Sequence, residues 1–390
     1  MTPAARVAAA ADILDGILGG APAEKALTGW ARGSRYAGSK DRAAVRDHVF
    51  QALRCLRSYA ALGGGEETTG RSLMLGAMRA EGADLDVIFS GEGHAPAPLS
   101  EEELAGGRAP EAGAEACDMP EWLWPALEAA LGDAAADEAS LMRERADVFL
   151  RVNPLYGTVA EAQAALAEEG VVSEVHPLSP MALKVLEGAR RVRLSHAFED
   201  GLVELQDAAS QAVVDWLPLD GAQTVLDYCA GGGGKSLAIA ARSDAKIVAS
   251  DIAPERMKDL PERATRAGAS IVVKSLQDLS TDDCFDFVLC DAPCSGSGAW
   301  RRSPAGKWQL SEDSLAALCD TQVEVLKAAS GHVAEGGQLA YVTCSLLGVE
   351  NEDVVARFQA LAPEWHCTVQ KRWLPSDGGD GFFGAIFARK

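Results

Sequence analysis

The sequence lacks the features of several classes of protein. No apolar run approaches the roughly 20 residues that a membrane-spanning helix requires, so no membrane segment is expected. The apolar N-terminal stretch carries Asp12 and Asp15, which favours an amphipathic helix over a signal peptide. The nine cysteines include no C-x-x-C pair, which argues against a zinc knuckle or a thioredoxin-type site, and we expect no metal. Their odd number and unpaired spacing favour a reducing compartment, so we expect a cytoplasmic protein. Separately, we expect a monomer.

Positive charge is scarce. The chain holds 36 Lys and Arg against 57 Asp and Glu, for a net charge of -21. Because phosphate binding requires cations, this balance argues against a nucleic-acid partner. The excess acid is concentrated, however: residues 61–150 hold five basic and 19 acidic residues, whereas residues 1–60 hold nine basic and five acidic ones. The acidic stretch predicts a solvated surface, and any attraction for RNA is expected to be local.

The first third of the chain has helical periodicity. Apolar residues recur at helical spacing in residues 7–18 and again in residues 39–62, which Gly63 to Gly65 terminate. Residues 91–117 are rich in Gly, Pro, Glu and Ala and predict a loop. We therefore expect a helical domain over residues 1–117. Helical spacing then returns over residues 120–145.

Strand-like segments dominate from Phe149 onward. Extended segments are expected at 150–154, 171–176 and 182–186, with a helix at 159–169. From about residue 217, apolar runs such as TVLDYCA, KIVASD, FDFVLCD and GQLAYVTC alternate with helices, which predicts a mostly parallel sheet covered on both faces. Residues 118–215 are thus expected to form a linker helix and a small α/β module. Residues 216–390 are expected to form a Rossmann-like α/β domain.

A glycine-rich turn follows the first of these runs. Glycines allow a sharp turn and a close approach of the backbone to a ligand. A Walker A loop would need Gly where Cys229 stands, and a dinucleotide fingerprint meets Ser236 or Leu237 where it needs Gly or Ala. The nucleoside-binding turn of a class I methyltransferase fits better, since Asp251 ends the next strand; a purely structural turn is the alternative. The predicted cofactor-binding residues are Cys229, Ala230, Gly231, Gly232, Gly233, Gly234, Lys235 and Asp251.

Two other strand ends carry a cysteine, Cys294 in DAPC and Cys344 in TCS. Carbon 5 of cytosine accepts a methyl group only after a thiolate has added to carbon 6, and cysteine suits that covalent catalysis. A carboxyl group such as Asp291 could protonate or hydrogen-bond ring nitrogen 3, and a second cysteine could remove the carbon-5 proton. The alternative role for a cysteine at a strand end is that of a small buried hydrophobic residue, and we adopt this interpretation for four other cysteines. These are Cys229, Cys284, Cys290 and Cys319.

An ordered set of motifs resembles the RsmB/Sun/Nop family of RNA (cytosine-5) methyltransferases over residues 118–390. The motifs are PEWL (120–123), LRVNP (150–154), QD (206–207), the glycine loop, DAPCSGSGAWRRSPAGKW (291–308), YVTCSLLGVENE (341–352) and DGFF (380–383). The resemblance implies that Cys344 attacks the base, Cys294 assists release and Asp291 contacts the base and the cofactor. It implies S-adenosylmethionine in the loop. The N-terminal helices resemble the NusB-like RNA-binding domain of the ribosomal RNA enzymes in this family.

The resemblance has departures. Family members usually have proline where this chain has Gly232, and they have an acid after the third strand where a gap-free alignment gives Gln277. Asp278 fits with a one-residue shift and is taken as the candidate cofactor contact. Glu350 and its neighbours Asn351 and Glu352 are expected to cap the next helix.

Three cations follow the Cys294 loop: Arg301, Arg302 and Lys307. They are candidates for phosphate contacts beside an extruded cytosine, with Trp308 packing or stacking; solvated loop cations are the alternative.

We expect S-adenosylmethionine-dependent methylation of carbon 5 of a cytosine in RNA, with 16S ribosomal RNA as the expected target. Transfer RNA, 23S ribosomal RNA, a DNA target with Cys294 as the nucleophile, and a non-catalytic RNA-binding assembly factor are the alternatives.

Overall fold

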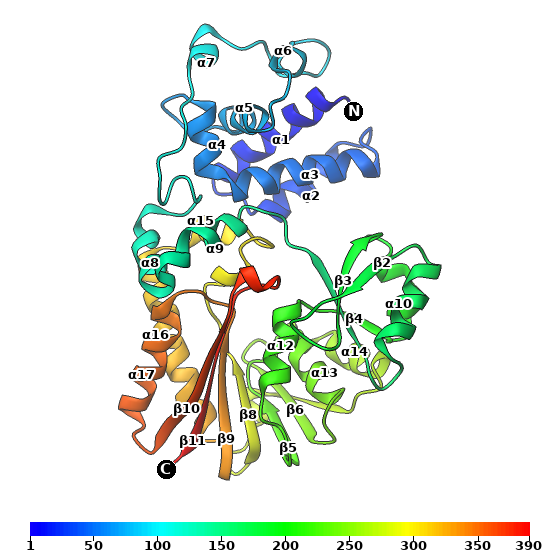
Figure 1. The fold of residues 1–390 in the computed structure, drawn as a ribbon, viewed down its shortest axis with the longest axis vertical. Helices are drawn as coiled ribbons and strands as arrows, with labels where there is room; N and C mark the ends of the chain where they lie inside the picture. Colours follow the sequence, from blue (N-terminus) through cyan, green and yellow to red (C-terminus); the bar gives the residue numbers. More distant parts are fainter. The chain divides into compact units, whose positions relative to one another are not determined.

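The computed structural model describes residues 1–390, which form two compact units (Figure 1). Unit 1 comprises Met1–Arg145 and Trp300–Gln309, and unit 2 comprises Ala146–Ala299 and Leu310–Lys390. No helix of either unit combines the length and the apolar character needed to cross a membrane.

Unit 1 is helical, as predicted. Its helices are α1 (Pro3–Leu18), α2 (Ala23–Gly33), α3 (Ser39–Arg54), α4 (Leu56–Gly63), α5 (Gly70–Ala80), α6 (Leu85–Ile88), α7 (Glu101–Ala105), α8 (Trp124–Leu131), α9 (Ala135–Leu141) and α15 (Ala305–Gln309). Helix α5 packs closely on two neighbours, because a Cβ on Gly70 would lie 2.0 Å from the Ala11 carbonyl oxygen and one on Gly76 would lie 1.9 Å from that of Tyr59. Glycine therefore sets these helix–helix distances.

The single helix expected over residues 39–62 is divided in the structure. The backbone leaves the helical conformation at Cys55, and α4 starts immediately afterwards. The buried carboxylate of Asp118 accepts hydrogen bonds from the Ser58 backbone N–H and hydroxyl, both at 2.8 Å, and so satisfies the first turn of α4. Arg143 compensates the charge of Asp118 at 2.8 Å. The acceptor for this first turn lies 60 residues away, so local periodicity does not reveal it.

The predicted boundary after residue 117 lies inside unit 1. The segment that follows contributes Asp118, Arg143 and helices α8 and α9 to this unit, and Gln51 donates to the Arg143 carbonyl at 3.0 Å. Helix α15 belongs to unit 1 as well, although its residues follow the Cys294 loop in sequence.

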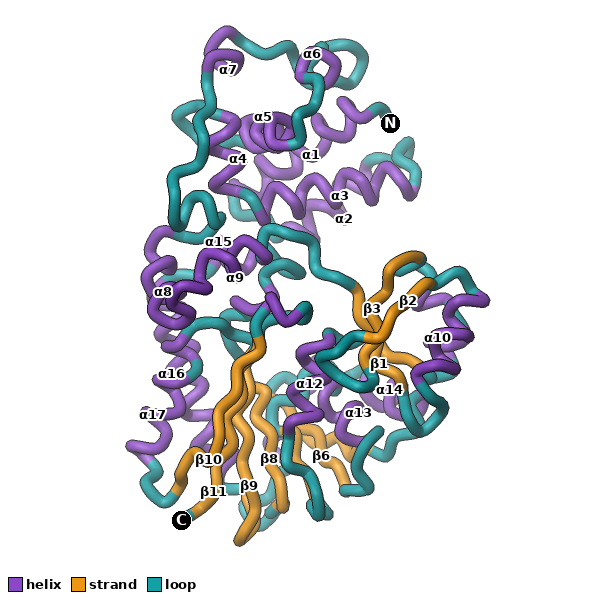
Figure 2. The backbone as a smooth tube through the Cα atoms, viewed as in Figure 1, coloured by secondary structure: helices purple, strands orange, loops and turns teal.

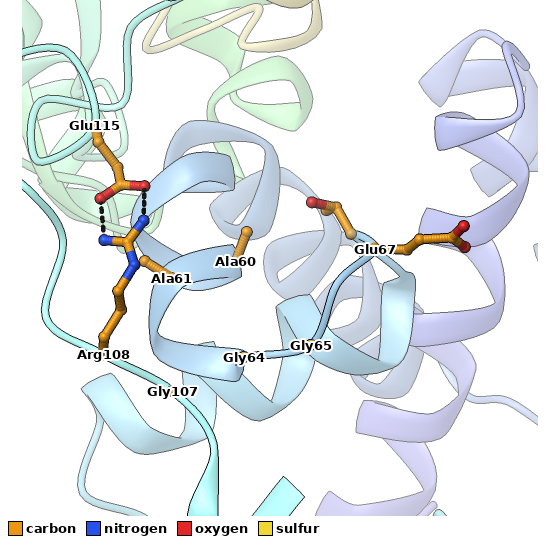
Figure 3. A pocket seen from close by; sticks show the side chains of 9 residues that line it. Ala60, Ala61, Gly64, Gly65, Glu67, Gly107, Arg108 and Glu115 are labelled. Atoms are coloured by element: carbon orange, nitrogen blue, oxygen red, sulfur yellow. Dashed lines mark hydrogen bonds and ion pairs between the residues drawn. The ribbon is translucent and has the colours of Figure 1, made fainter. Parts of the chain in front are cut away.

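Residues 91–117 form mainly loop, as predicted, apart from the short helix α7. Beside this loop lies a hollow of about 420 Å³, lined by Gly64, Gly65, Glu67, Gly107, Arg108 and Glu115 among others (Figure 3). The Arg108 guanidinium binds both Glu115 oxygens, at 2.6 and 2.7 Å. The cation that faces this hollow is therefore already neutralised.

Unit 2 begins with a small antiparallel sheet of order β2-β3-β1-β4. Its strands are β1 (Val148–Val152), β2 (Val172–Val175), β3 (Ala182–Glu187) and β4 (Val203–Leu205), with helices α10 (Val159–Glu168) and α11 (His196–Glu199). Apolar side chains of β1, β3 and α10, including Leu150, Leu183 and Leu166, form its core. This is the α/β module expected from the sequence.

The main sheet of unit 2 has seven strands in the order β10-β11-β9-β8-β5-β6-β7. The strands are β5 (Thr224–Asp227), β6 (Lys246–Asp251), β7 (Ile271–Ser275), β8 (Phe285–Asp291), β9 (Val333–Thr343), β10 (Trp365–Trp373) and β11 (Phe382–Arg389). Strands β5 to β9 pair in parallel, as predicted, whereas β10 and β11 add an antiparallel edge that we did not predict. Figure 2 shows β10 and β11 beside β9 at one side of this sheet. The helices are α12 (Ala208–Trp216), α13 (Gly234–Ala240), α14 (Leu260–Arg266), α16 (Glu312–Ser330) and α17 (Glu352–Leu361).

The chain order reverses between β5 and β8 in this sheet. Ligands bind at such a switch point, outside the carboxyl ends of the strands. The ends of β5, β6, β8 and β9 carry the glycine loop, Asp251, the Asp291–Cys294 segment and Cys344. Parallel pairing therefore brings every predicted catalytic segment to one edge.

Candidate active site

A cavity of about 960 Å³ opens at this edge of the sheet, entirely within unit 2. Among the predicted site residues, its lining includes Cys229, Ala230, Gly231, Gly232, Gly234, Lys235, Asp251, Asp291, Cys294 and Cys344. Segments more than 100 residues apart in sequence thus share one cavity, which is the juxtaposition that the strand-end pattern predicted.

The glycine loop turns by two left-handed residues, Gly231 (φ 54°) and Gly233 (φ 75°). A Cβ on Gly233 would lie 2.2 Å from Leu260 Cδ1, so this glycine faces α14 and not the cavity. Its role is structural, while Gly231, Gly232 and Gly234 line the cavity. A ligand can approach the backbone there because these residues have no side chain.

Asp251 is buried at the end of β6 with a defined orientation. Its carboxylate accepts from the Gly231 N–H at 2.8 Å and from the Ala253 N–H at 2.9 Å, and Arg256 lies 3.3 Å away. These contacts fix the loop to the second strand. They leave further lone pairs of the carboxylate available to ribose hydroxyls.

Asp278 lies elsewhere. It ends the 3₁₀ turn Leu276–Asp278, is exposed, and accepts a hydrogen bond from the Ser275 hydroxyl at 2.7 Å. Gln277 is exposed too, and of this turn Leu276 lines the cavity. The structure therefore places an apolar side chain where we expected an acid.

Lys235 and Asp291 form an ion pair that we did not predict. Lys235 Nζ lies 2.7 Å from Asp291 Oδ2, with the lysine side chain 9% exposed and the aspartate 31% exposed. Burial alone would lower the pKa of Lys235, but the charge and hydrogen bond of Asp291 raise it overall, with Cys344 and Asp227 contributing. The lysine therefore stays protonated in the cavity. Both residues had been assigned from separate motifs, so only the tertiary structure pairs them.

Cys294 and Cys344 are adjacent, with 3.4 Å between their sulfur atoms. The hydrogen bond to Cys344 raises the pKa of the Cys294 thiol well above its ordinary value, and burial and nearby negative charge add to this effect. Either sulfur can be the donor in the hydrogen bond between them. A thiolate is the nucleophilic form of cysteine, so the raised pKa makes Cys294 a poor nucleophile.

A buried acid, Asp227, lies behind the glycine loop. The Ser236 hydroxyl donates to its Oδ2 at 2.6 Å, and its other oxygen has no hydrogen-bond partner. Burial raises its pKa to about 7 against the effect of the Ser236 hydrogen bond, and the charge of Asp291 adds to the rise. The carboxyl group is therefore close to half-protonated at neutral pH.

Two of the three predicted phosphate contacts are buried in unit 1, so the expectation is corrected for them. Lys307 is fully buried and donates to the Arg54 carbonyl at 3.0 Å, and burial lowers its pKa to about 8. Trp308 donates to the Leu53 carbonyl at 2.6 Å, so it packs rather than stacks on a base. Arg301 is 6% exposed. Lys307 and Trp308 thus satisfy carbonyls that end α3, whereas the Arg301 carbonyl accepts from the Arg54 side chain at 2.8 Å. Arg302 is exposed and remains a candidate.

The other cysteines mostly agree with the interpretation as small hydrophobes. Cys290 and Cys319 are buried and Cys229 is half-buried. Cys284 is exposed, so that interpretation was wrong for it. Burial raises the pKa of the Cys319 thiol to about 11 and raises that of the Cys290 thiol as well, which makes both poor nucleophiles.

The expected cap at residues 350–352 is confirmed in part, because Asn351 occupies the N-cap position of α17 and Glu352 lies in the first turn, whereas Glu350 lies before the helix. The Asn351 side chain makes no capping hydrogen bond; it accepts from the Thr343 hydroxyl at 2.6 Å and donates to the Ser345 carbonyl at 2.9 Å. Glu350 is fully buried. Its carboxylate accepts hydrogen bonds from the segments of both cysteines. Nothing in the local sequence distinguishes this buried acid from a capping one.

Comparisons with known proteins agree with this geometry. Residues 214–387 match the family described as 16S rRNA methyltransferase RsmB/F, and residues 119–193 match the RsmF/B-like ferredoxin-like domain. The chain belongs to the RsmB/F family. Ribosomal RNA small subunit methyltransferase B of Klebsiella pneumoniae subsp. pneumoniae is 33% identical over 285 residues, and that of Photorhabdus laumondii subsp. laumondii is 32% identical over 288. Each alignment covers 70% of this chain and 66% of the relative, slightly less than two thirds of its length.

Solved structures share the fold. The crystal structure of PH0851 is 24% identical with a TM-score of 0.75, covering 100% of this chain and 99% of that one. A methyltransferase homologue from Pyrococcus horikoshii is 22% identical with a TM-score of 0.60, covering 70% and 96%. With the sheet order of unit 2, these likenesses identify the fold as that of a class I methyltransferase preceded by a helical N-terminal region, as predicted.

Proposed function

We propose that the protein methylates carbon 5 of a cytosine in RNA, with S-adenosylmethionine as the methyl donor and 16S ribosomal RNA as the target. The observation that carries the proposal is the 3.4 Å contact between Cys294 and Cys344 inside the cavity that also holds the glycine loop and Asp251. The names of the matching family and of the Klebsiella relative, both referring to the small ribosomal subunit, support the choice of RNA.

The groups that line the cavity fit S-adenosylmethionine. The backbone of Gly231 to Gly234 offers a close approach, and Asp251 offers a buried carboxylate for the ribose hydroxyls. Ile252 lines the same cavity with an 84% exposed apolar side chain, which suits an adenine ring. S-adenosylmethionine supplies an electrophilic methyl group when bound.

Residues of this chain then carry out each step of bond formation and bond cleavage on the base. The Cys344 thiolate adds to carbon 6 of cytosine, forming a C–S bond and moving an electron pair toward ring nitrogen 3. The Lys235–Asp291 pair stabilises or protonates that nitrogen. After carbon 5 has accepted the methyl group, Cys294, which has lost its own proton to solvent, removes the carbon-5 proton as a thiolate. The electron pair restores the ring double bond, and the Cys344 thiolate leaves.

We assign RNA capture to unit 1, in keeping with the predicted NusB-like RNA-binding domain. Its first 60 residues are the part of the chain in which basic residues outnumber acidic ones. The acidic remainder predicts weak binding to naked RNA, since phosphates are repelled. A ribonucleoprotein particle, which adds protein contacts, is therefore the expected form of the substrate.

The test compares Cys344→Ala with Cys294→Ala. With Cys294→Ala we expect a protein–RNA adduct that survives denaturation, because attack proceeds and release stops. With Cys344→Ala we expect none. The reverse pattern would assign the attack to Cys294, as in a DNA cytosine methyltransferase. Tritiated methyl donor should label small-subunit particles more than 23S or transfer RNA; no label in any RNA would favour a non-catalytic assembly factor.

A further inference from the structure

Glu350 connects the two cysteine segments. Its Oε1 accepts from the Ser295 backbone N–H at 2.7 Å, and its Oε2 accepts from the Ser295 and Ser345 hydroxyls, both at 2.5 Å. Ser295 directly follows Cys294, and Ser345 directly follows Cys344. One fully buried carboxylate therefore binds the residue after each cysteine.

A buried carboxylate is costly unless hydrogen bonds satisfy it. Glu350 is satisfied by hydroxyl and amide donors, among them Gln322 Nε2 at 3.0 Å from Oε1. The same Gln322 nitrogen donates to the Pro293 carbonyl at 2.9 Å, directly before Cys294. Glu350 thus contacts the residue after Cys294 directly and the residue before it through Gln322.

The two cysteines depend on Glu350 unequally. Cys344 directly follows β9, whose final residues are paired with β8 on one side and β11 on the other. Asn351 additionally binds Thr343 and Ser345 on either side of Cys344. Cys294 lies in an irregular segment beyond β8, where Glu350 and Gln322 supply the side-chain contacts described above. Moving the carboxylate should therefore displace Cys294 more than Cys344.

We propose that Glu350 is a positioning residue that holds Cys294 against Cys344, so that Cys294 can reach the carbon-5 proton once Cys344 is bound to the base. The inference rests on the proposed function, and it adds a third residue to the release step. The contact that it maintains is also the main cause of the raised pKa of the Cys294 thiol. Glu350 touches neither base nor cofactor in this role.

The first experiment requires no RNA. Diamide oxidises two thiols in contact to a disulfide, and mass spectrometry of peptides measures the rate for Cys294 and Cys344. Glu350→Asp keeps the charge but withdraws the carboxylate by about one C–C bond, roughly 1.5 Å, and we expect the rate to fall at least fivefold. Glu350→Gln preserves the length, and its amide can donate to the two serine hydroxyls, so we expect a rate within threefold of wild type. Glu352→Asp is the matched control, since Glu352 pairs with Arg372 at the half-exposed start of α17.

The second experiment follows the RNA adduct. Glu350→Asp should accumulate the denaturation-resistant adduct as Cys294→Ala does, with turnover at least tenfold lower and unchanged cofactor affinity. Glu350→Gln and Glu352→Asp should turn over without accumulation. Wild-type behaviour of Glu350→Asp in both experiments would overturn the positioning role. So would a Glu350→Gln variant as defective as Glu350→Asp, because charge and not placement would then be the property that matters.

If Glu350→Asp does not fold, Ser295→Ala replaces it. That variant removes one hydroxyl donor and leaves the Ser295 N–H bond, so a smaller loss in the same direction is expected, and wild-type behaviour would reject the inference. Failure of the proposed function gives a different pattern. In that case wild-type protein would methylate no RNA and form no adduct with Cys294→Ala, while the diamide rates would still report whether Glu350 positions Cys294.

Discussion

Lys235 and Asp291 join the two halves of the site, with 2.7 Å between the ammonium nitrogen and the carboxylate oxygen. Lys235 lies in the first turn of α13, directly after the glycine loop, and Asp291 ends β8 three residues before Cys294. The pair is partly shielded from solvent, so screening by water is weaker than at the surface. One ion pair therefore ties the cofactor loop to the segment that carries the chemistry.

Removing either partner should impair methylation and stability together. Lys235→Met leaves a partly buried carboxylate without its partner, and Asp291→Asn leaves a buried ammonium, so each is expected to lower kcat/KM about 10²–10⁴-fold. In the double variant the losses should be less than additive, because the two groups act as a unit. Steady-state methylation measures this, with denaturant unfolding as the stability control. Fully additive losses would contradict a joint role.

Cofactor affinity should distinguish Asp251 from Asp278. Asp251 is buried in the lining of the cavity, whereas Asp278 is exposed and bound to Ser275. We expect Asp251→Ala to weaken S-adenosylmethionine binding at least tenfold by isothermal titration calorimetry, and Asp278→Ala to change it less than twofold. Equal losses would restore Asp278 as a cofactor contact and require movement of the turn at Leu276–Asp278.

The site residues that follow the strands could be predicted from the sequence because their positions depend on local sequence patterns. A parallel strand places the residue after its carboxyl end at a known edge, so Asp251, Asp291, Cys294 and Cys344 converge wherever the topology is of this kind. The pattern of apolar runs was sufficient for these assignments. It was also sufficient for the helical nature of the first third, although not for the break at Cys55.

Buried charged residues could not be predicted in this way. Lys307 had the sequence context of a loop cation, but its partner is the Arg54 carbonyl, 253 residues away. Glu350 had the context of a helix cap, but its partners are serines on two other segments. In each case a long-range hydrogen bond decides the environment of the charge, and neither periodicity nor composition contains that information.

Two adjacent glycines should respond differently to alanine. Gly233 has a φ of 75°, and its Cβ would meet Leu260, so Gly233→Ala should cost about 1–3 kcal/mol of stability. Gly232 has no left-handed φ, and its Cβ would approach only Arg263 Nη1, at 3.3 Å, so Gly232→Ala should change stability by about 0.5 kcal/mol or less. Urea denaturation compares them. Equal losses of stability in the two variants would mean that the left-handed backbone conformation of Gly233 does not determine the cost of the alanine.

Salt dependence of RNA binding should separate Arg302 from Lys307. Arg302 is exposed, so Arg302→Gln should reduce the slope of log K against log salt by about one if it neutralises a phosphate. Lys307 is fully buried, so Lys307→Met should leave the slope unchanged in folded protein. Fluorescence anisotropy at several salt concentrations provides the measurement. A changed slope for Lys307→Met alone would show that its burial is lost in the RNA complex.

Asp227 should make stability fall as pH rises. Its pKa is raised from 3.8 to about 7 by burial, so between these values the folded state holds a proton that the unfolded state has released. Linkage then requires the free energy of unfolding to decrease with increasing pH, by up to about 1.4 kcal/mol per pH unit and about 4 kcal/mol in all. Above pH 7 the loss is complete.

The matched variant is Asp227→Asn, which cannot ionise and still offers an oxygen to the Ser236 hydroxyl. Its stability relative to wild type should increase from pH 4 to pH 7 and then stay constant, while the other titrating groups cancel in the comparison. Urea unfolding of both proteins across this range measures the difference. A difference independent of pH would mean that Asp227 is ionised in the folded protein throughout, and that the Lys235 charge in this cavity stabilises it more than burial opposes it.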